Sequence, residues 1–425
     1  MSHFAVIAPP LFSHLRALEA LSRELIARGH TITFIQQAEA LDLLREPDIA
    51  RFAVGETTHP AGSLAHTLKL ASRPGGLSIL GLIDDMARTT DMLCNELPAA
   101  LEHLAVDGLI VDQMEPAGGL VAEALGIPFV SVACALPVNR EPGLPLPVMP
   151  FEYADDERAH KLYSSSQQVY DWMMRRHNRV IARHAQAFGL SPRHGLHECL
   201  SPLAQISQTI PSLDFPRHDV QDRFYSVGPL RNPVQSSAER WSVNPDKPFI
   251  FASLGTLQGH RFKNFKTIAR ACQSLDLQLL IAHCGGLDET QAEQLRGAGA
   301  QWVTDFADQN AVLQQAQAVI THGGLNTVAD AITHATPILA MPLAFDQPGV
   351  ASRVVWSGIG RKVSRFCSSD TLAQNLDLLL NEPSYRQRLV GMQQTLLQAG
   401  GVTRAASIVE QTLGHEKSDP VRAAS

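Results

Sequence analysis

The stretch that decides the fold runs from Trp302 to Gln347 and reads WVTDFADQNAVLQQAQAVITHGGLNTVADAITHATPILAMPLAFDQ. Its centre, AVITHGGLNTVADAI, is an apolar run that ends in His322 and two glycines and continues directly into a helical pattern. The first N–H groups of a helix have no partner within the helix, and the helix dipole favours negative charge there. The stretch therefore predicts an anion site at a strand end, with the His322 imidazole as an additional donor.

The rest of the chain repeats this alternation of short apolar runs and helical patterns. Such alternation predicts parallel sheets with helices on both faces, and a chain of 425 residues exceeds what one core usually holds. The expected strands lie at 4–10, 31–35, 107–114, 127–133, 248–256, 277–285, 301–306, 318–322, 337–342 and 360–364. We therefore expect an α/β protein with two Rossmann-like doubly wound domains.

A polar, proline-containing stretch without periodicity, residues 231–247, predicts a linker between these domains. The expected division is an N-terminal domain at 1–230, a C-terminal domain at 248–415 and a disordered tail at 416–425. Two similar α/β units joined in this way predict a central cleft between them.

Composition excludes several classes of protein. The net charge of -7 argues against nucleic-acid binding, and no run of about 18 apolar residues is present to span a membrane. The six cysteines form no C-x-x-C pair, which argues against zinc or a disulfide framework. The N-terminus has no basic segment typical of a signal peptide. We expect a cytoplasmic protein; peripheral contact with the inner membrane is left open, and no strongly basic amphipathic helix demands it.

Two residues at expected strand ends are candidates for acid–base chemistry. The first strand is not followed by G-x-G-x-x-G, so a nicotinamide-type fingerprint is absent, and His14 occupies the start of the next helix. The helix dipole there favours the neutral imidazole, which can accept a proton. Asp112 ends another strand, and a carboxylate beside a histidine fixes the tautomer and stabilises the imidazolium. Alternatively, His14 packs at a helix start and Asp112 caps the following helix.

Two segments of the N-terminal half are candidates for the acceptor site. Residues 57–95 are apolar with few charges, and residues 137–150 are rich in proline, as binding loops on α/β scaffolds often are. A helix expected at about 160–188 carries an aromatic and methionine stripe that favours core packing. The stripe comprises Tyr163, Tyr170, Trp172, Met173 and Met174.

The residues of the 302–347 stretch also carry a family resemblance. In order they show F-x-x-Q, T-H-G-G-x-N-[ST], an acidic residue, P-x-x-x-x-P and D-Q. This signature resembles that of nucleotide-sugar-dependent glycosyltransferases of the GT-B fold, which include plant secondary-product and bacterial macrolide enzymes. The likeness extends from the His14 turn to the terminal helices, and it implies a GT-B architecture with two Rossmann-like domains facing a central cleft.

The resemblance implies contacts to the nucleoside of a UDP-sugar. Gln309 and the backbone around Phe306 would contact the uracil, and Phe306 stands where the plant enzymes have a stacking tryptophan. Asp330 stands where many members have a glutamate on the ribose hydroxyls. It is one methylene shorter than that glutamate.

The resemblance also implies contacts to the pyrophosphate. His322 would bind it, helped by the N–H groups around Gly324, Asn326 and Thr327. Thr256 matches a position that often touches a phosphate. Taken singly, each of these polar residues could instead be a structural residue at a helix start.

For the sugar and the reaction, the resemblance implies further roles. Asp346 and Gln347 would accept the sugar hydroxyls, and Leu325 replaces a frequent tryptophan, which leaves the sugar preference open. With His14 as base and Asp112 behind it, an inverting transfer from UDP-glucose would need no metal or other cofactor.

The resemblance implies a xanthophyll diol, zeaxanthin, as the hydrophobic acceptor, with mono- and di-β-glucosides as products in carotenoid biosynthesis. The residues alone suit a macrolide, flavonoid or sterol equally well. A non-hydrolysing UDP-sugar epimerase of the same architecture is the alternative from another class of enzyme. A catalytically dead sensor of sugar nucleotides is disfavoured because His14 and Asp112 are both present.

Overall fold

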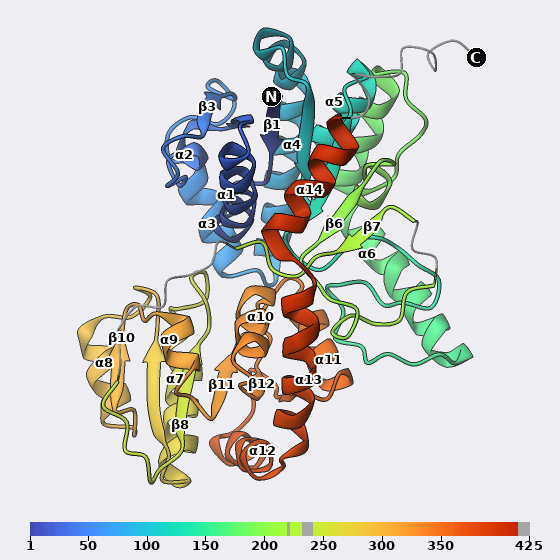
Figure 1. Ribbon diagram of the computed structural model, residues 1–425. Helices are drawn as coiled ribbons and strands as arrows, with labels where there is room; N and C mark the ends of the chain where they lie inside the picture. The colour runs from blue at the N-terminus through green and yellow to red at the C-terminus, as the bar shows by residue number, and fades with distance from the viewer. Residues whose placement is uncertain (219–221, 232–240, 415–425) are drawn as a thin grey trace.

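The computed structural model describes residues 1–218, 222–231 and 241–414 and contains two parallel sheets (Figure 1). Within this part of the chain the N-terminal sheet has seven strands in the order β3-β2-β1-β4-β5-β6-β7. The strands are β1 (His3–Ile7), β2 (Thr31–Gln36), β3 (Ala50–Ala53), β4 (Gly108–Asp112), β5 (Phe129–Ala133), β6 (Gln205–Ser207) and β7 (Phe224–Ser226). Every pair of neighbours is parallel.

The C-terminal sheet has six described strands in the order β10-β9-β8-β11-β12-β13, again all parallel. They are β8 (Phe249–Ser253), β9 (Gln278–Ala282), β10 (Trp302–Thr304), β11 (Ala318–Thr321), β12 (Ile338–Ala340) and β13 (Gly360–Lys362). Each sheet reverses its direction of growth once, between β1 and β4 and between β8 and β11. Open α/β sheets bind ligands beyond the strand ends at such switch points.

Helices cover the faces of both sheets, as the alternation of patterns predicts. Those of the N-terminal part are α1 (Phe12–Ala27), α2 (Ala38–Leu41), α3 (Ser63–Ser72), α4 (Leu77–Leu104), α5 (Pro116–Leu125), α6 (Glu157–Ala187) and η1 (Leu196–Glu198). Those that follow are α7 (Phe262–Ser274), α8 (Glu289–Arg296), α9 (Gln309–Leu313), α10 (Leu325–Thr333), α11 (Gln347–Trp356), α12 (Ser369–Asn381), α13 (Ser384–Gln398) and α14 (Gly401–Gly414). None of these helices is long and apolar enough to cross a bilayer.

The last helix changes the division expected from sequence. Helix α14 returns to the N-terminal half and packs beside α1, where Figure 1 shows the red and dark-blue helices together. Val402, Ile408 and Val409 are buried in the same core as Phe4 and Leu18. The N-terminal core therefore includes a helix that the sequence assigned to the C-terminal domain, 248–415. Most of the expected linker and the tail from 416 lie outside the described residues.

Two further expectations differ from the structure. The apolar segment 57–95, expected to be a binding loop, is mostly helical because it contains α3 and much of α4. The strands β3, β6 and β7 were not expected, since each is only three or four residues long and carries no continuous apolar run. Residues 137–150 do form an irregular segment, as expected.

Candidate active site

Four segments that carry candidate residues lie at the two switch points. In the N-terminal sheet, His14 follows β1 and Asp112 ends β4, and these strands are neighbours. In the C-terminal sheet, Gly255 follows β8 and His322 follows β11, which are neighbours too. Because all strands of a sheet are parallel, each pair comes together at a carboxyl edge.

His14 and Asp112 form a buried pair. Nδ1 of His14 lies 2.7 Å from Oδ2 of Asp112, and the two residues are 7% and 0% exposed. The other carboxylate oxygen, Oδ1, accepts a hydrogen bond from the backbone N–H of Met114 at 2.8 Å. Asp112 does not cap helix α5; Glu115 does, through the N–H of Ala117. The pair therefore fixes one ring nitrogen as a donor and leaves Nε2 as the acceptor.

The pKa of His14 is shifted in the direction opposite to the one that the helix dipole predicts. Burial lowers the pKa of the imidazole, but the carboxylates of Asp112 and Asp346 more than offset this, so the pKa is raised above 6.5. The dipole of helix α1 favours a neutral ring and would lower the pKa. Its effect on the pKa is weaker here than that of the two nearby carboxylates. A histidine with this pKa accepts a proton more readily than an ordinary one.

Cys134, which follows β5, completes the cluster and was not expected from sequence. Its thiol hydrogen-bonds the Asp112 carboxylate, and one ligand atom from each of Cys134, Asp112 and His14 lies within 4.8 Å of the others. Burial and the Asp112 charge raise the pKa of this thiol well above its ordinary value. A protonated thiol donates to the carboxylate and is a poor metal ligand, so the group fits a base and its supports better than a metal site.

The anion site expected at His322 has a close-fitting backbone. A Cβ at Gly255 would lie 2.7 Å from Cε1 of His322, and one at Gly324 would lie 2.5 Å from its Nε2. The imidazole is therefore held between two glycines, and Gly255 also has a φ of +77° that favours glycine. Burial lowers the pKa of His322 to about 4, and the ring donates to the carbonyl of Ser253. The ring is neutral in this arrangement.

Helix α10 begins at this point with its N-terminus open. Its N-cap is Gly324, which offers no side chain to the first N–H groups. Asn326 lies in the first turn and is partly buried, whereas Thr327 beside it is 8% exposed. Unpartnered N–H groups at a helix start are suited to a phosphate.

Asp330 is the centre of a polar network that the sequence did not reveal. Its carboxylate pairs with Arg231 and accepts a hydrogen bond from Nε2 of Gln309. Arg231 also donates to the carbonyl of Asn326, and Thr327 lies 3.4 Å from the Gln309 carbonyl oxygen. Burial lowers the pKa of Arg231 to about 10, which leaves it charged at neutral pH. Arg231 follows no local pattern that would have singled it out in the expected linker.

Asp346 and Gln347 stand where β12 leads into α11. Asp346 precedes the helix but makes no side-chain capping bond; its Oδ2 accepts from the N–H of Leu136, 3.2 Å away in the other half. Burial raises the pKa of this carboxyl. The Gln347 oxygen accepts the N–H groups of Leu343 and Ala344, both at 2.9 Å. The side-chain oxygen of Gln347 is therefore bonded within the protein, and its NH₂ group makes neither of these two bonds.

The two candidate regions face each other. His14 lies close enough to Asp346 for the carboxylate to raise its pKa, and Asp346 touches Leu136. A Cβ at Gly323, next to His322, would lie 3.3 Å from the carbonyl of Gln347. Gly349 packs so closely on the carbonyl of Pro147 that no side chain would fit. Asp346 and Gln347, at the start of α11, are thus near both His14 and Gly323 at the boundary between the halves.

Two remaining donor-site candidates are open to solvent. The Phe306 side chain is 67% exposed, and Thr256 is also exposed. Neither makes a contact that reveals its function.

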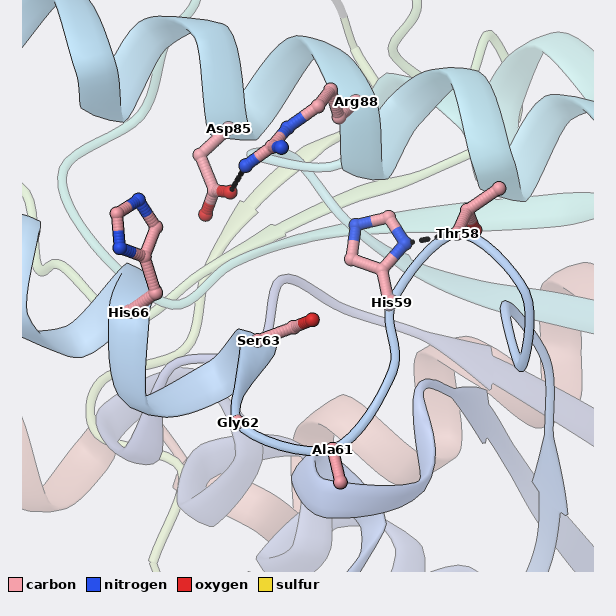
Figure 2. Close-up of a pocket in the computed structure, with 8 residues that line it drawn as sticks. All are labelled: Thr58, His59, Ala61, Gly62, Ser63, His66, Asp85 and Arg88. Atoms are coloured by element: carbon pink, nitrogen blue, oxygen red, sulfur yellow. Dashed lines mark hydrogen bonds and ion pairs between the residues drawn. The ribbon is translucent and has the colours of Figure 1, made fainter.

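A cavity of about 330 Å³ lies within the segment 57–95, and Figure 2 shows its lining. Asp85 and Arg88 of α4 form an ion pair at 2.6 Å on one side, and the imidazoles of His59 and His66 lie on the other. This lining is polar, so the cavity does not match the apolar acceptor site expected for the segment.

Comparisons with known proteins agree with this geometry. Residues 5–395 match the family described as UDP-glucoronosyl and UDP-glucosyl transferase. The chain is 57% identical over 415 residues to a zeaxanthin glucosyltransferase of Pantoea ananas, covering 97% of this chain and 96% of the relative. It is 51% identical over 423 residues to a zeaxanthin glucosyltransferase of Pseudescherichia vulneris, covering 98% and 100%.

Solved structures show the same architecture at low identity. The glycotransferase of kitacinnamycin is 21% identical with a TM-score of 0.78, covering 97% of this chain and 99% of that one. The calicheamicin glycosyltransferase CalG4 is 20% identical with a TM-score of 0.75, covering 98% and 99%. These likenesses confirm the expected GT-B fold.

Proposed function

Because the chain belongs to the UDP-glucoronosyl and UDP-glucosyl transferase family, we propose that it transfers glucose from UDP-glucose to the hydroxyl groups of zeaxanthin. The choice of acceptor rests on two relatives of that name, each more than half identical over nearly the whole chain. The chemistry rests on one observation, the buried His14–Asp112 pair at the carboxyl edge of the N-terminal sheet. The products are the mono- and di-β-glucosides.

In this reaction His14 is the general base. An acceptor hydroxyl gives its proton to Nε2 as its oxygen attacks the anomeric carbon from the face opposite UDP. Asp112 accepts the N–H of the other ring nitrogen and stabilises the imidazolium that forms. The bond from the anomeric carbon to the UDP oxygen breaks as the new bond forms, so the configuration inverts from α to β.

The departing UDP gains negative charge and is stabilised by the second switch point. The open start of α10 supplies N–H groups to the diphosphate, and His322 lies between Gly255 and Gly324 beside it. A bound diphosphate raises the pKa of His322, and the protonated ring then has a donor on both nitrogens. Asp330 binds the ribose and Gln309 the uracil side of the nucleotide, while Asp346 accepts sugar hydroxyls.

Transfer by these groups requires no metal or other cofactor. The groups offered to the diphosphate are backbone N–H groups and the His322 imidazole, and burial raises the pKa of the Cys134 thiol well above its ordinary value. Turnover should therefore be unchanged after treatment with EDTA and after addition of Mg²⁺. A drop in turnover that only a divalent ion restores would contradict this.

Zeaxanthin is a long apolar molecule that partitions into bilayers. We therefore expect the protein to meet its acceptor at a membrane surface.

The decisive experiment offers the purified protein UDP-glucose with zeaxanthin, a macrolide, a flavonoid or a sterol, followed by mass analysis. Zeaxanthin should gain one and then two hexoses, with a His14→Ala variant as the inactive control. Glucosylation of another alcohol with none of zeaxanthin would contradict the acceptor. Conversion of the sugar nucleotide without any acceptor would instead reveal an epimerase.

A further inference from the structure

Helix α6 (Glu157–Ala187) has an apolar stripe on its solvent-exposed face. Leu162, Val169 and Trp172 are 47%, 64% and 66% exposed. They are spaced seven and three residues apart, so they lie along one side of the helix. The sequence favours Trp172 as part of a core stripe, but only Tyr163 and Met174 of that stripe are buried. Trp172 points the other way.

Basic side chains surround this stripe. Between 161 and 183 the helix carries five basic residues and one acid, Asp171, and that acid pairs with Arg140. Lys161, Arg175 and Arg179 are exposed, and no acidic partner is found for them among the described residues. The guanidinium of Arg175 lies 4.6 Å above the Trp172 ring. We call these six residues, Leu162, Val169, Trp172, Lys161, Arg175 and Arg179, the α6 face.

The other charged residues of α6 are either paired or lie at its N-terminal end. Arg176 and Arg183 also point outward but pair with Asp84 and Asp91 of α4. The acids Asp155, Asp156 and Glu157 lie together before and at the first turn. Arg175 and Arg179 therefore lie in the second half of the helix, away from these acids, whereas Lys161 lies one turn after them, in a chain whose net charge is -7. A local cationic patch on an anionic protein indicates an anionic partner.

The α6 face has a suitable position on the molecule. Figure 1 shows α6 at the periphery of the N-terminal half, on the side away from α2 and α3. The inner side of the helix packs on α4, where His177 lies 2.9 Å from Thr90, so the outer side is presented by a fixed support. Residues 151–156 join its N-terminal end to the segment 137–150, whose Pro147 packs against Gly349 of α11. The face is thus joined by one stretch of chain to the region that receives the acceptor.

We infer that the α6 face binds the surface of an anionic lipid bilayer. An amphipathic helix with basic residues and tryptophan lies in the interface, with its apolar side chains below the headgroups and its cations among them. Tryptophan is favoured at this depth. The inference deepens the proposed function and rests on it for its purpose, since a bilayer is where an apolar diol is found.

Vesicle cosedimentation tests the inference without any catalysis. The protein should sediment with vesicles of phosphatidylcholine and phosphatidylglycerol and stay in solution with phosphatidylcholine alone. Reversal of Lys161, Arg175 and Arg179 to Glu should weaken binding on the order of 100-fold, and Trp172→Ser about tenfold. Binding by the wild type should fall with added salt.

Matched controls come from the C-terminal half. Leu397→Ser removes an apolar side chain that is 70% exposed, and Lys263→Glu with Arg270→Glu reverses two exposed charges of α7. These variants should bind vesicles as the wild type does, and all variants should melt at the wild-type temperature. Absence of binding to anionic vesicles, or equal loss in the controls, would overturn the inference.

Activity then separates this inference from the proposed function. With zeaxanthin in detergent micelles, the α6 variants should retain wild-type turnover; with zeaxanthin in anionic vesicles, they should turn over at least tenfold more slowly. Turnover in vesicles equal to wild type would overturn the link between the face and the acceptor. No glucosylation of zeaxanthin in either medium would contradict the proposed function and leave the vesicle binding as measured.

Discussion

His14 has one ring nitrogen committed to Asp112 and the other available to substrate. Removal of the ring should therefore abolish proton transfer and leave nucleotide binding intact. We expect His14→Ala to lower kcat by about 10²–10⁴-fold. Calorimetric titration should give an unchanged Kd for UDP. A matched control is His30→Ala, because His30 is a partly buried histidine that pairs with Glu410, away from the cleft. Turnover of His14→Ala near the wild-type rate would remove it from the mechanism.

The raised pKa of His14 predicts a pH dependence. The base acts in its neutral form, so activity should fall as the pH drops below this pKa, which lies above the ordinary 6.5. The Asp112 carboxylate raises the pKa of His14 more than any other charge, so Asp112→Asn should lower this pKa. The acidic limb of the kcat/KM profile should then move to lower pH. The remaining rate should also be much lower, because the tautomer is no longer fixed. If the acidic limb of the profile does not move, it reports the titration of a group other than His14.

Arg231 holds the carboxylate that we assign to the ribose. Arg231→Met should raise the KM for UDP-glucose about tenfold with a smaller change in kcat, because a charge-assisted contact that orients Asp330 is lost. Arg231→Lys should restore only part of the wild-type KM, because a lysine lacks the forked guanidinium that contacts both Asp330 and the Asn326 carbonyl.

Binding of UDP and of 2′,3′-dideoxy-UDP distinguishes this role from general damage. Arg231→Met should weaken the first ligand and leave the second nearly unchanged, because the analogue has no ribose hydroxyls for Asp330 to accept. An equal loss for both ligands would show that Arg231 supports the helix and not the ribose contact.

At the scale of elements, the apolar runs predicted the central strands because parallel strands covered on both faces must be apolar throughout. The strands β4, β5, β8 and β9 are buried at every position, and each was expected. The strand β3 (Ala50–Ala53) was not expected. It lies at the edge of the sheet, is only four residues long and is mostly exposed, so it has no buried apolar run in the sequence. Local sequence patterns thus identify strands that are covered on both faces of the sheet but do not identify short strands at its edges.

In the candidate site, too, local sequence predicted some features and not others. His14, Asp112 and His322 were expected because each stands at a strand end, which local sequence reveals. Contacts between distant segments were not expected: Arg231 with Asp330, Leu136 with Asp346, and Cys134 with Asp112. The first two contacts depend on how the two halves are placed, and the third on the pairing of β4 with β5 in one sheet. No periodicity along one segment encodes either arrangement.

For the whole molecule, the two switch points explain why one chain needs two sheets. Each switch point offers one kind of chemistry, a proton acceptor in the N-terminal half and an anion site in the C-terminal half. The buried pair of Arg353 on α11 with Asp214, at 2.6 Å, joins the two halves. In the proposed reaction the acceptor and the donor would therefore enter different halves and react where the carboxyl edges meet.

Helix α14 makes the two halves mutually dependent, and this gives a final prediction. Val409 is completely buried against the N-terminal core, whereas Gln411, two residues later, is exposed. Val409→Asp places an unpaired charge in that core and should cost about 3–5 kcal/mol of folding free energy, whereas Gln411→Asp should cost little. In thermal unfolding followed by limited proteolysis, the N-terminal half of Val409→Asp should be digested first. A fragment that contains the C-terminal sheet should still bind UDP, because the anion site depends on β8, β11 and α10. Loss of both halves at one temperature, with no such fragment, would show instead that the molecule unfolds as a single unit.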